Sequence, residues 1–306
     1  MLNFKFFISF YLDISKKICI FAAANETMEH LRIIFYRIWA HIRHRITAWN
    51  TGGEGIHSPY LFYLVRFLFY DRNAYYCFNP IEQRREAMLH APKPIRVEDY
   101  GTGTSGTRLL CDIARRSLGT PKESQLLFRM ALYLAEEVHR EEGDRTPLFL
   151  ELGTSLGLTT AYLAASDSRS RVVTFEGASE IADIARMNWK KLSLQNIECI
   201  IGNIDETLPR FVKDTLYNNT RARADLIFLD ANHTYEATLR YYEQLHPLVH
   251  RKTIIVVDDI HWSPDMNRAW NEIRRRKEVT SSMDLLELGV LFFDPDYLPK
   301  HYTLRI

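Results

Sequence analysis

Five short, mostly apolar segments alternate with helical patterns between residues 148 and 257, and this alternation limits the fold more than any other feature of the chain. The segments are 148–152, 171–175, 197–201, 224–229 and 253–257. Strands alternating with helices predict an α/β fold with a doubly wound, mostly parallel sheet. A polar or acidic residue lies at the end of every segment. Because such sheets bind ligands outside the carboxyl ends of their strands, the sequence predicts one ligand site along that edge.

The composition excludes a protein that binds nucleic acid through a large net positive charge, since 39 Lys and Arg residues are balanced by 38 Asp and Glu residues. The cysteines, Cys19, Cys77, Cys111 and Cys199, lie far apart, which argues against a zinc site or a disulfide framework. That pattern fits a reducing compartment. We expect a cytoplasmic protein that binds no nucleic acid.

The first 27 residues predict a leader rather than a membrane anchor. Asp13, Lys16 and Lys17 divide the apolar run into two pieces, each well short of the roughly 20 residues that span a bilayer. The same charges interrupt the apolar core of a signal peptide. We expect residues 1–27 to be either untranslated, with Met28 as the true start, or disordered.

Residues 29–49 predict an amphipathic helix with arginines at the margin of an apolar stripe. Such a stripe can rest on an anionic membrane, or pack against its own domain or a twin subunit in a homodimer. The modest charged face favours packing. The stripe consists of Leu31, Ile34, Phe35, Ile38, Trp39, Ile42, Ile46 and Trp49.

Two glycine loops have the strand–loop–helix pattern that can hold a nucleotide. In the first, Gly101, Gly103 and Gly106 spell GxGxxG, which supports a nicotinamide-dependent oxidoreductase as one hypothesis. The strand before it, residues 95–100, is short and carries two acids, whereas a central parallel strand should be nearly all apolar. We therefore expect a surface loop here and the cofactor site at the second loop, which follows the strand 148–152.

The second loop belongs to a set of residues that resembles class I methyltransferases that use S-adenosylmethionine. The spacing from GTSLGLTTAYLA to LDANHTYEATLRYYEQL to IIVVDDIHW is similar to the metal-dependent, catechol O-methyltransferase-like type. This resemblance implies a Rossmann-like domain over 121–306 that ends in an antiparallel hairpin. Residues 28–120 fall outside the resemblance, and we expect them to form a mainly helical extension or cap. The motif residues are Glu151, Gly153, Gly157, Glu176, Gly202 and Asn203.

The resemblance also implies where the cofactor binds, with Gly153, Thr154 and Gly157 along its methionine and Glu176 on its ribose. S-adenosylmethionine is a sulfonium cation without phosphates, and the loop GTSLGLTT has none of the Lys or Arg that a phosphate-binding loop uses. The remaining residues assigned to the cofactor are Glu151, Gly202, Asn203, Asp205 and Asp230.

Asp230, Asp258 and Asp259 form an all-oxygen set that suits a hard cation such as Mg²⁺. The resembled type usually has Asn at the third position, so Asp259 departs from it. Since neighbouring strand residues face opposite ways, both acids can bind one ion only if the chain turns at Asp258. Alternatively, Asp259 caps the following helix. A metal here would bind a substrate hydroxyl and lower its pKa.

A general base is also needed. The resembled type has a lysine three residues after its first metal aspartate, and here that position is His233. Histidine titrates near neutrality, so we favour His233 together with Asp230 as the catalytic pair, and His261 is the alternative base. Aromatic and apolar residues that could wall a substrate pocket are Trp262, Met266, Trp270, Tyr75 and Tyr76.

The leading hypothesis is an S-adenosylmethionine-dependent, metal-assisted O-methyltransferase that acts on a hydroxylated small molecule or sugar. Two alternatives stay open. One is the oxidoreductase that uses the 101–106 loop, and the other is a non-catalytic methyltransferase-like scaffold whose 29–49 helix binds a partner or a membrane.

Overall fold

The computed structural model describes residues 26–48, 51–97 and 106–306. Residues 1–25 of the expected leader lie outside this range, as do Gly101, Gly103 and Trp49.

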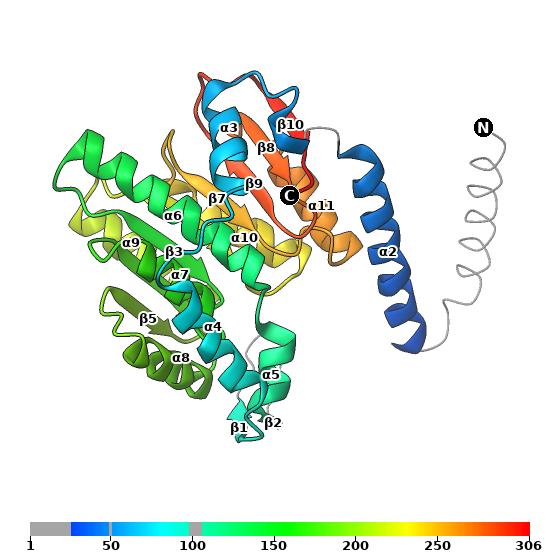
Figure 1. Cartoon of the computed structure of the whole chain (residues 1–306), viewed down its shortest axis with the longest axis vertical. Helices are drawn as coiled ribbons and strands as arrows, with labels where there is room; N and C mark the ends of the chain where they lie inside the picture. Colours follow the sequence, from blue (N-terminus) through cyan, green and yellow to red (C-terminus); the bar gives the residue numbers. More distant parts are fainter. Residues whose placement is uncertain (1–25, 49–50, 98–105) are drawn as a thin grey trace.

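An eight-stranded sheet forms the centre of the molecule, in the order β10-β8-β9-β7-β6-β3-β4-β5 (Figure 1). All neighbouring strands run parallel except β9, which is antiparallel to β7 and to β8. The predicted parallel α/β sheet and its terminal hairpin are thus confirmed. The strands are β3 Leu148–Leu152, β4 Arg171–Glu176, β5 Ile197–Ile201, β6 Leu226–Leu229, β7 Ile254–Val257, β8 Ser281–Asp284, β9 Gly289–Phe292 and β10 Lys300–Thr303.

Helices cover both faces of this sheet because its central strands are buried on both sides and alternate residues feed two separate cores. Phe149 and Leu226 face α6, whereas Leu150 and Ile227 face the side of α9, α10 and α11. The helices are α2 Glu26–Thr47, η1 Thr51–Gly53, α3 Pro59–Tyr63, η2 Leu64–Phe69, α4 Phe78–Leu89, α5 Leu110–Ser117, α6 Pro121–Glu142, α7 Leu158–Ser166, α8 Ser179–Lys191, α9 Ile204–Asn218, α10 Tyr235–Leu245, η3 His246–Leu248 and α11 Pro264–Ile273.

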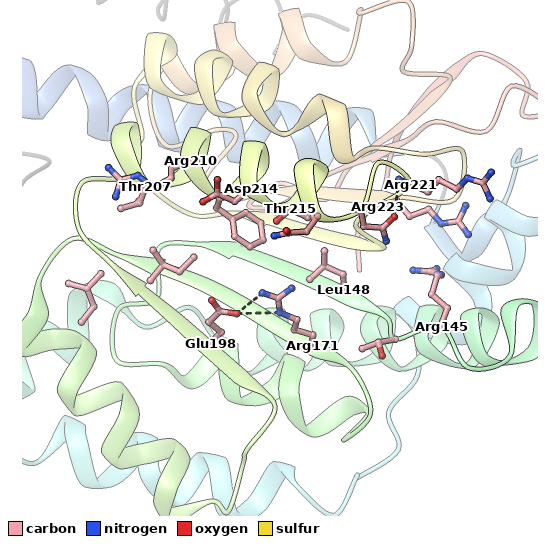
Figure 2. Close-up of a pocket in the computed structure, with 17 residues that line it drawn as sticks. Arg145, Leu148, Arg171, Glu198, Thr207, Arg210, Asp214, Thr215, Arg221 and Arg223 are labelled. Atoms are coloured by element: carbon pink, nitrogen blue, oxygen red, sulfur yellow. Dashed lines mark hydrogen bonds and ion pairs between the residues drawn. The ribbon is translucent and has the colours of Figure 1, made fainter.

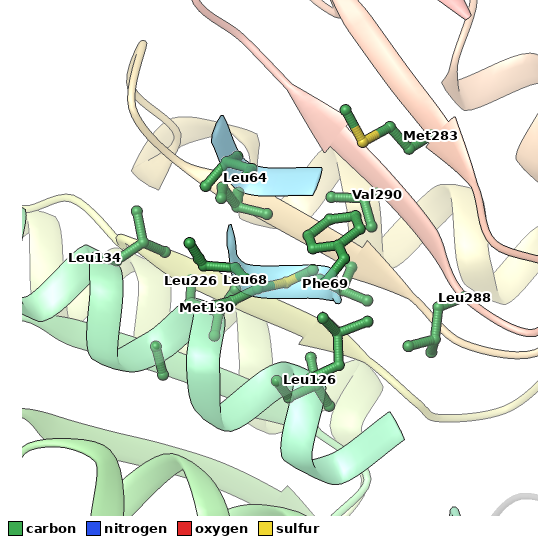
Figure 3. Packing of buried hydrophobic residues seen from close by; sticks show 14 of the residues in the cluster. Leu64, Leu68, Phe69, Leu126, Met130, Leu134, Leu226, Met283, Leu288 and Val290 are labelled. Atoms are coloured by element: carbon green, nitrogen blue, oxygen red, sulfur yellow. The ribbon is translucent and has the colours of Figure 1, made fainter. Parts of the chain in front are cut away.

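Part of the expected extension belongs to the core of the sheet. Leu64 and Phe69 of η2 are buried in one cluster with Met130 of α6 and with Leu226 and Val290 of the sheet (Figure 3). Residues before 120 therefore complete the apolar cover of one sheet face.

The first glycine loop has a different context from a dinucleotide site. Strand β1, Pro94–Val97, pairs only with β2, Gly106–Leu109, in an antiparallel ribbon outside the main sheet. A dinucleotide-binding loop follows a parallel strand of the central sheet, so this ribbon does not support the oxidoreductase hypothesis.

Helix α2 stands at one side of the domain (Figure 1). Its buried side is formed by Ala40 and His44, and the Arg37 guanidinium lies 4.0 Å from the centre of the Trp262 ring. The predicted apolar stripe points elsewhere: Ile34 is 51% exposed and Ile46 57% exposed. The expectation that the domain itself buries the stripe is wrong, because α2 packs on the domain with the face that carries small and polar side chains.

Within the described ranges, the structure contains no helix that is both long enough and apolar enough to cross a membrane.

Replacing Leu64 by alanine should lower the free energy of unfolding by about 2–4 kcal/mol, because its fully buried side chain helps to cover the sheet. Chemical denaturation measures this loss. Phe67→Ala is the matched control, since Phe67 lies in the same turn but is 57% exposed. If Leu64→Ala left the free energy of unfolding of the sheet unchanged, the segment 64–69 would be a cap that is separable from the core.

Candidate active site

The turn after β3 passes so close to the end of β6 that only glycine fits. Gly153 has φ +99°, and a Cβ atom there would lie 1.9 Å from the carbonyl oxygen of Asp230. The amides of Gly153 and Thr154 both donate to the carbonyl of Phe175 at 3.1 Å. The turn is therefore fixed to β4 on one side and to β6 on the other.

Gly157 ends this turn and begins α7 with φ +75°. The indole of Trp189 donates to its carbonyl at 2.7 Å, and a Cβ atom on Gly157 would lie 2.6 Å from the same indole nitrogen. Gly157 thus serves packing against α8, and it does not line the cavity described below.

Glu151 and Thr154 lie behind the turn. Glu151 is fully buried, and its Oε2 accepts hydrogen bonds from the hydroxyls of Thr160 and Thr174. Burial raises the pKa of Glu151 to about 7, although the two hydroxyls act in the opposite direction. Thr154 is buried too, with its hydroxyl 2.6 Å from that of Thr174. Both residues thus stabilise the turn through buried hydrogen bonds.

A cavity of about 570 Å³ opens at the carboxyl edge of the sheet. Since Leu152 pairs with Phe175 and with Leu229, the residues that follow these strands meet there. The predicted residues that line the cavity are Gly153, Glu176, Asn203, Asp205 and His233, while Gly202 and Asp230 do not reach it. Lining residues that sequence reasoning missed include Arg108, Ser155, Ala178 and Tyr241.

Glu176 is held in place by the backbone around it. Its Oε2 accepts from the amide of Ser155 at 2.8 Å and its Oε1 from the amide of Ala178 at 2.9 Å. These two backbone amides fix the direction in which the carboxylate points.

The far end of the cavity is the start of α9. Asn203 caps this helix by accepting from the amide of Asp205 at 3.0 Å. Asp205 itself is paired with Arg240, with N–O distances of 2.8 to 3.0 Å. Gly202, at φ +132°, supplies the turn before the cap.

The β1–β2 ribbon and α5 border the cavity opposite the sheet. Val97, Arg108, Ile113 and Ser117 line it from that side, and the Ser117 hydroxyl lies 2.7 Å from that of Ser155. The described residues of the ribbon therefore form part of the wall of this cavity.

Next to the cavity, Asp230, His233 and Asp258 each place one ligand atom so that all three lie within 4.8 Å of one another. Nε2 of His233 is 3.3 Å from Asp230 and 3.6 Å from Asp259. The backbone turns at Asp259, where φ is +54°, yet its carboxylate remains outside the closest group. Asp259 does not cap α11 either, because Ser263 does so.

These acids crowd one another. Burial raises the pKa of Asp230 well above its ordinary value. Burial, then the neighbouring Asp230 and Asp259, raise that of Asp258. Burial also raises the pKa of Asp259, which His233 and Arg37 oppose. Carboxylates this close need a proton or a cation between them, so the group can hold either.

The alternative base, His261, has both ring nitrogens occupied. One lies 2.8 Å from Oδ2 of Asp284 and the other 2.9 Å from the side-chain nitrogen of Asn267. In contrast, Nε2 of His233 is buried and has no hydrogen-bond partner among the described residues. The two candidate bases therefore differ in whether their ring nitrogens are already hydrogen-bonded.

The prediction that aromatic and apolar side chains wall a substrate pocket is wrong for most of the residues named. Met266 and Trp270 are 2% and 1% exposed and belong to the core under α11. Tyr75 packs on Phe128, and Tyr76 bonds to the carbonyl of Ala165, both away from the acids. Periodicity alone cannot distinguish core aromatics from pocket aromatics, and of this set Trp262 stays near the acids.

A second cavity of about 580 Å³ lies beside β5 and α9 (Figure 2). It is rich in arginine, but Arg171 pairs with Glu198 at 2.6 Å and Arg145 with Asp225 at 2.6 Å. In the described part of the chain, no predicted site residue lines it. This groove is therefore separate from the candidate site.

Residues 150–260 match the model of a family described as a methyltransferase domain. They span the Gly153 turn, Glu176 and the acids. The chain therefore contains a methyltransferase domain. That domain places all these residues along one sheet edge. No curated protein sequence matches the chain.

Among solved structures, the chain is similar to the SAH-bound Podospora anserina methyltransferase PaMTH1, with 12% identity, 74% of this chain and 91% of that chain covered, and a TM-score of 0.50. That likeness shows a shared fold. An O-methyltransferase from Bacillus cereus in complex with SAH has 18% identity, coverages of 75% and 94%, and a TM-score of 0.49. The O-methyltransferase TomG from Streptomyces achromogenes, in complex with SAM, has 18% identity, coverages of 58% and 82%, and a TM-score of 0.46.

The buried carboxyl of Glu151 should make stability depend on pH. Its folded pKa of about 7 exceeds the ordinary value of 4.5, so the folded methyltransferase holds this proton longer than the unfolded chain. The contribution is fully present below pH 4.5 and is lost as pH rises through 7, by about 3 kcal/mol in total. Denaturation of wild type and Glu151→Gln, without cofactor, at several pH values measures the difference.

The matched control Glu180→Gln removes a partly exposed carboxyl in the first turn of α8 and should keep the wild-type pH slope. A Glu151→Gln variant with the same slope as wild type would contradict the assignment.

Proposed function

We propose that this methyltransferase is an O-methyltransferase that uses a divalent cation and acts on a hydroxylated small molecule or sugar. One observation carries the proposal: the glycine turn, the ribose-binding candidate Glu176 and the group Asp230, His233 and Asp258 lie along one edge of the sheet. A methyl donor and a metal-bound hydroxyl would then meet between them.

The cavity supports the proposed cofactor site. Gly153 presents backbone without a side chain, and Glu176 faces the space with a carboxylate that its neighbours hold in place. Asn203 and Asp205 border the far end, where the resemblance puts the adenine. S-adenosylmethionine supplies an electrophilic methyl group on a cationic sulfur.

The acids fit a divalent cation. Asp230 and Asp258 are mutually close carboxylates whose pKa values burial raises, and a cation between them would offset their repulsion. Asp230 and Asp258 would hold the ion, with Asp259 at the rim. The ion would lower the pKa of an acceptor hydroxyl and orient its oxygen.

His233 would take the proton from the acceptor hydroxyl as its oxygen bonds to the methyl carbon. The carbon–sulfur bond breaks at the same time, and its electron pair stays on sulfur. Asp259, 3.6 Å from Nε2, would stabilise the imidazolium that forms.

S-adenosylmethionine should bind the chain without added metal, and Glu176→Gln should weaken binding at least about tenfold because a charged acceptor of the ribose hydroxyls is lost. Isothermal titration calorimetry measures this. Glu180→Gln, four residues further on, is the control. A folded chain that releases no heat with S-adenosylmethionine would refute the cofactor site, and one that binds NADH instead would revive the oxidoreductase hypothesis.

Removing the metal with EDTA should abolish methyl transfer to a panel of catechols, phenols and sugars but spare cofactor binding. Asp258→Asn should weaken Mn²⁺ binding at least about tenfold. His233→Gln should slow transfer about 100-fold or more while keeping the Mn²⁺ affinity within about threefold, as expected of a base. Asp265→Asn removes an exposed acid of α11 as the control.

Two results would contradict this assignment. Transfer that survives EDTA would exclude the metal, and a His233→Gln variant that no longer binds Mn²⁺ would make His233 a ligand rather than the base.

A further inference from the structure

Helix α2 has two unlike faces. One is seated on the domain: His44 is 6% exposed and its Nε2 lies 3.5 Å from Asp284, and Nε2 of His41 is 3.4 Å from Glu287. The other points away from the domain and is apolar. Seven large side chains on it are each 43–57% exposed: Leu31, Ile34, Phe35, Ile38, Trp39, Ile42 and Ile46. We call these seven residues the α2 stripe.

The α2 stripe is continuous. Its members are one, three or four residues apart, and at 100° per residue they cover an arc of about 140° along four turns of helix. Scattered apolar side chains on a surface need no explanation, but a contiguous band of this length marks an interaction surface.

The charged residues around the α2 stripe indicate which kind of surface it would bind. From residue 31 to 47 the helix carries four arginines and no acidic residue. Arg32 and Arg43 follow one margin of the stripe, Arg45 lies just inside the other, and all three are exposed. The Arg43 guanidinium also lies 5.3 Å from the ring centre of Trp39, an amphipathic residue that suits a membrane–water boundary.

A second copy of the chain fits less well. Stripe against stripe would bring arginine margins together, with no carboxylate on residues 31–47 to pair with them. An anionic bilayer offers both an apolar layer for the stripe and phosphates for the arginines. We propose that α2 lies flat on anionic membrane surfaces, with the α2 stripe at the boundary of the lipid headgroups and acyl chains.

Co-sedimentation of the full chain with vesicles tests this. The chain should bind vesicles of phosphatidylcholine mixed with phosphatidylglycerol at least about tenfold more tightly than phosphatidylcholine alone, and salt should weaken the binding. Equal binding to both vesicles, or none to the anionic ones, would overturn the proposal.

Two variants of α2 locate the contact. Arg43→Gln with Arg45→Gln should weaken binding about 30-fold, since two cations near the surface are lost. Ile38→Gln with Ile42→Gln should weaken it at least as much. Met187→Gln with Leu298→Gln is the control, because it removes two equally exposed apolar side chains elsewhere and should bind like wild type. Circular dichroism checks that every variant is folded.

The remaining outcomes decide against the proposal. If the variant with Ile38→Gln and Ile42→Gln in the α2 stripe binds vesicles like wild type, another segment such as residues 1–25 makes the contact. If sedimentation without lipid shows a dimer that this variant dissociates, the stripe is an interface between two copies.

Discussion

The close approach of two backbones at Gly153 organises the whole functional edge. Only at a residue without Cβ can the turn after β3 lie against the carbonyl of Asp230. This contact brings the cavity that would hold the methyl donor next to the acids that would hold the acceptor. A bulkier residue would separate these two halves, and each alone lacks the chemistry of the other.

Sequence reasoning succeeded where one local rule decides the outcome. Alternating strands and helices fixed the parallel sheet, and strand ends placed Glu176, Asn203 and Asp230 at one edge. The hairpin of β8 and β9 followed from the resemblance. The last strand, β10, lies outside this hairpin and pairs parallel with β8, because strand pairing at a sheet edge depends on tertiary contacts.

The predictions that failed concern residues whose surroundings depend on packing between distant segments. The motif alone could not place Glu151 behind the turn, since its burial is set by Thr160 and Thr174. Likewise, nothing in the spacing of Asp258 and Asp259 shows that His233 completes the closest group. For α2 the stripe was found, but helical periodicity identifies an apolar face without identifying what covers it.

The attachment of α2 has a consequence for how an acceptor would arrive. Arg37 covers Trp262, and His41 reaches Glu287, so the helix is fastened beside the acid rim. A bilayer under the α2 stripe would then act as a reservoir at the entrance. Hydroxylated compounds with an apolar body partition into lipid, and their supply would follow the mole fraction in the membrane rather than the bulk concentration. Selectivity would then begin with solubility, before any side chain touches the acceptor.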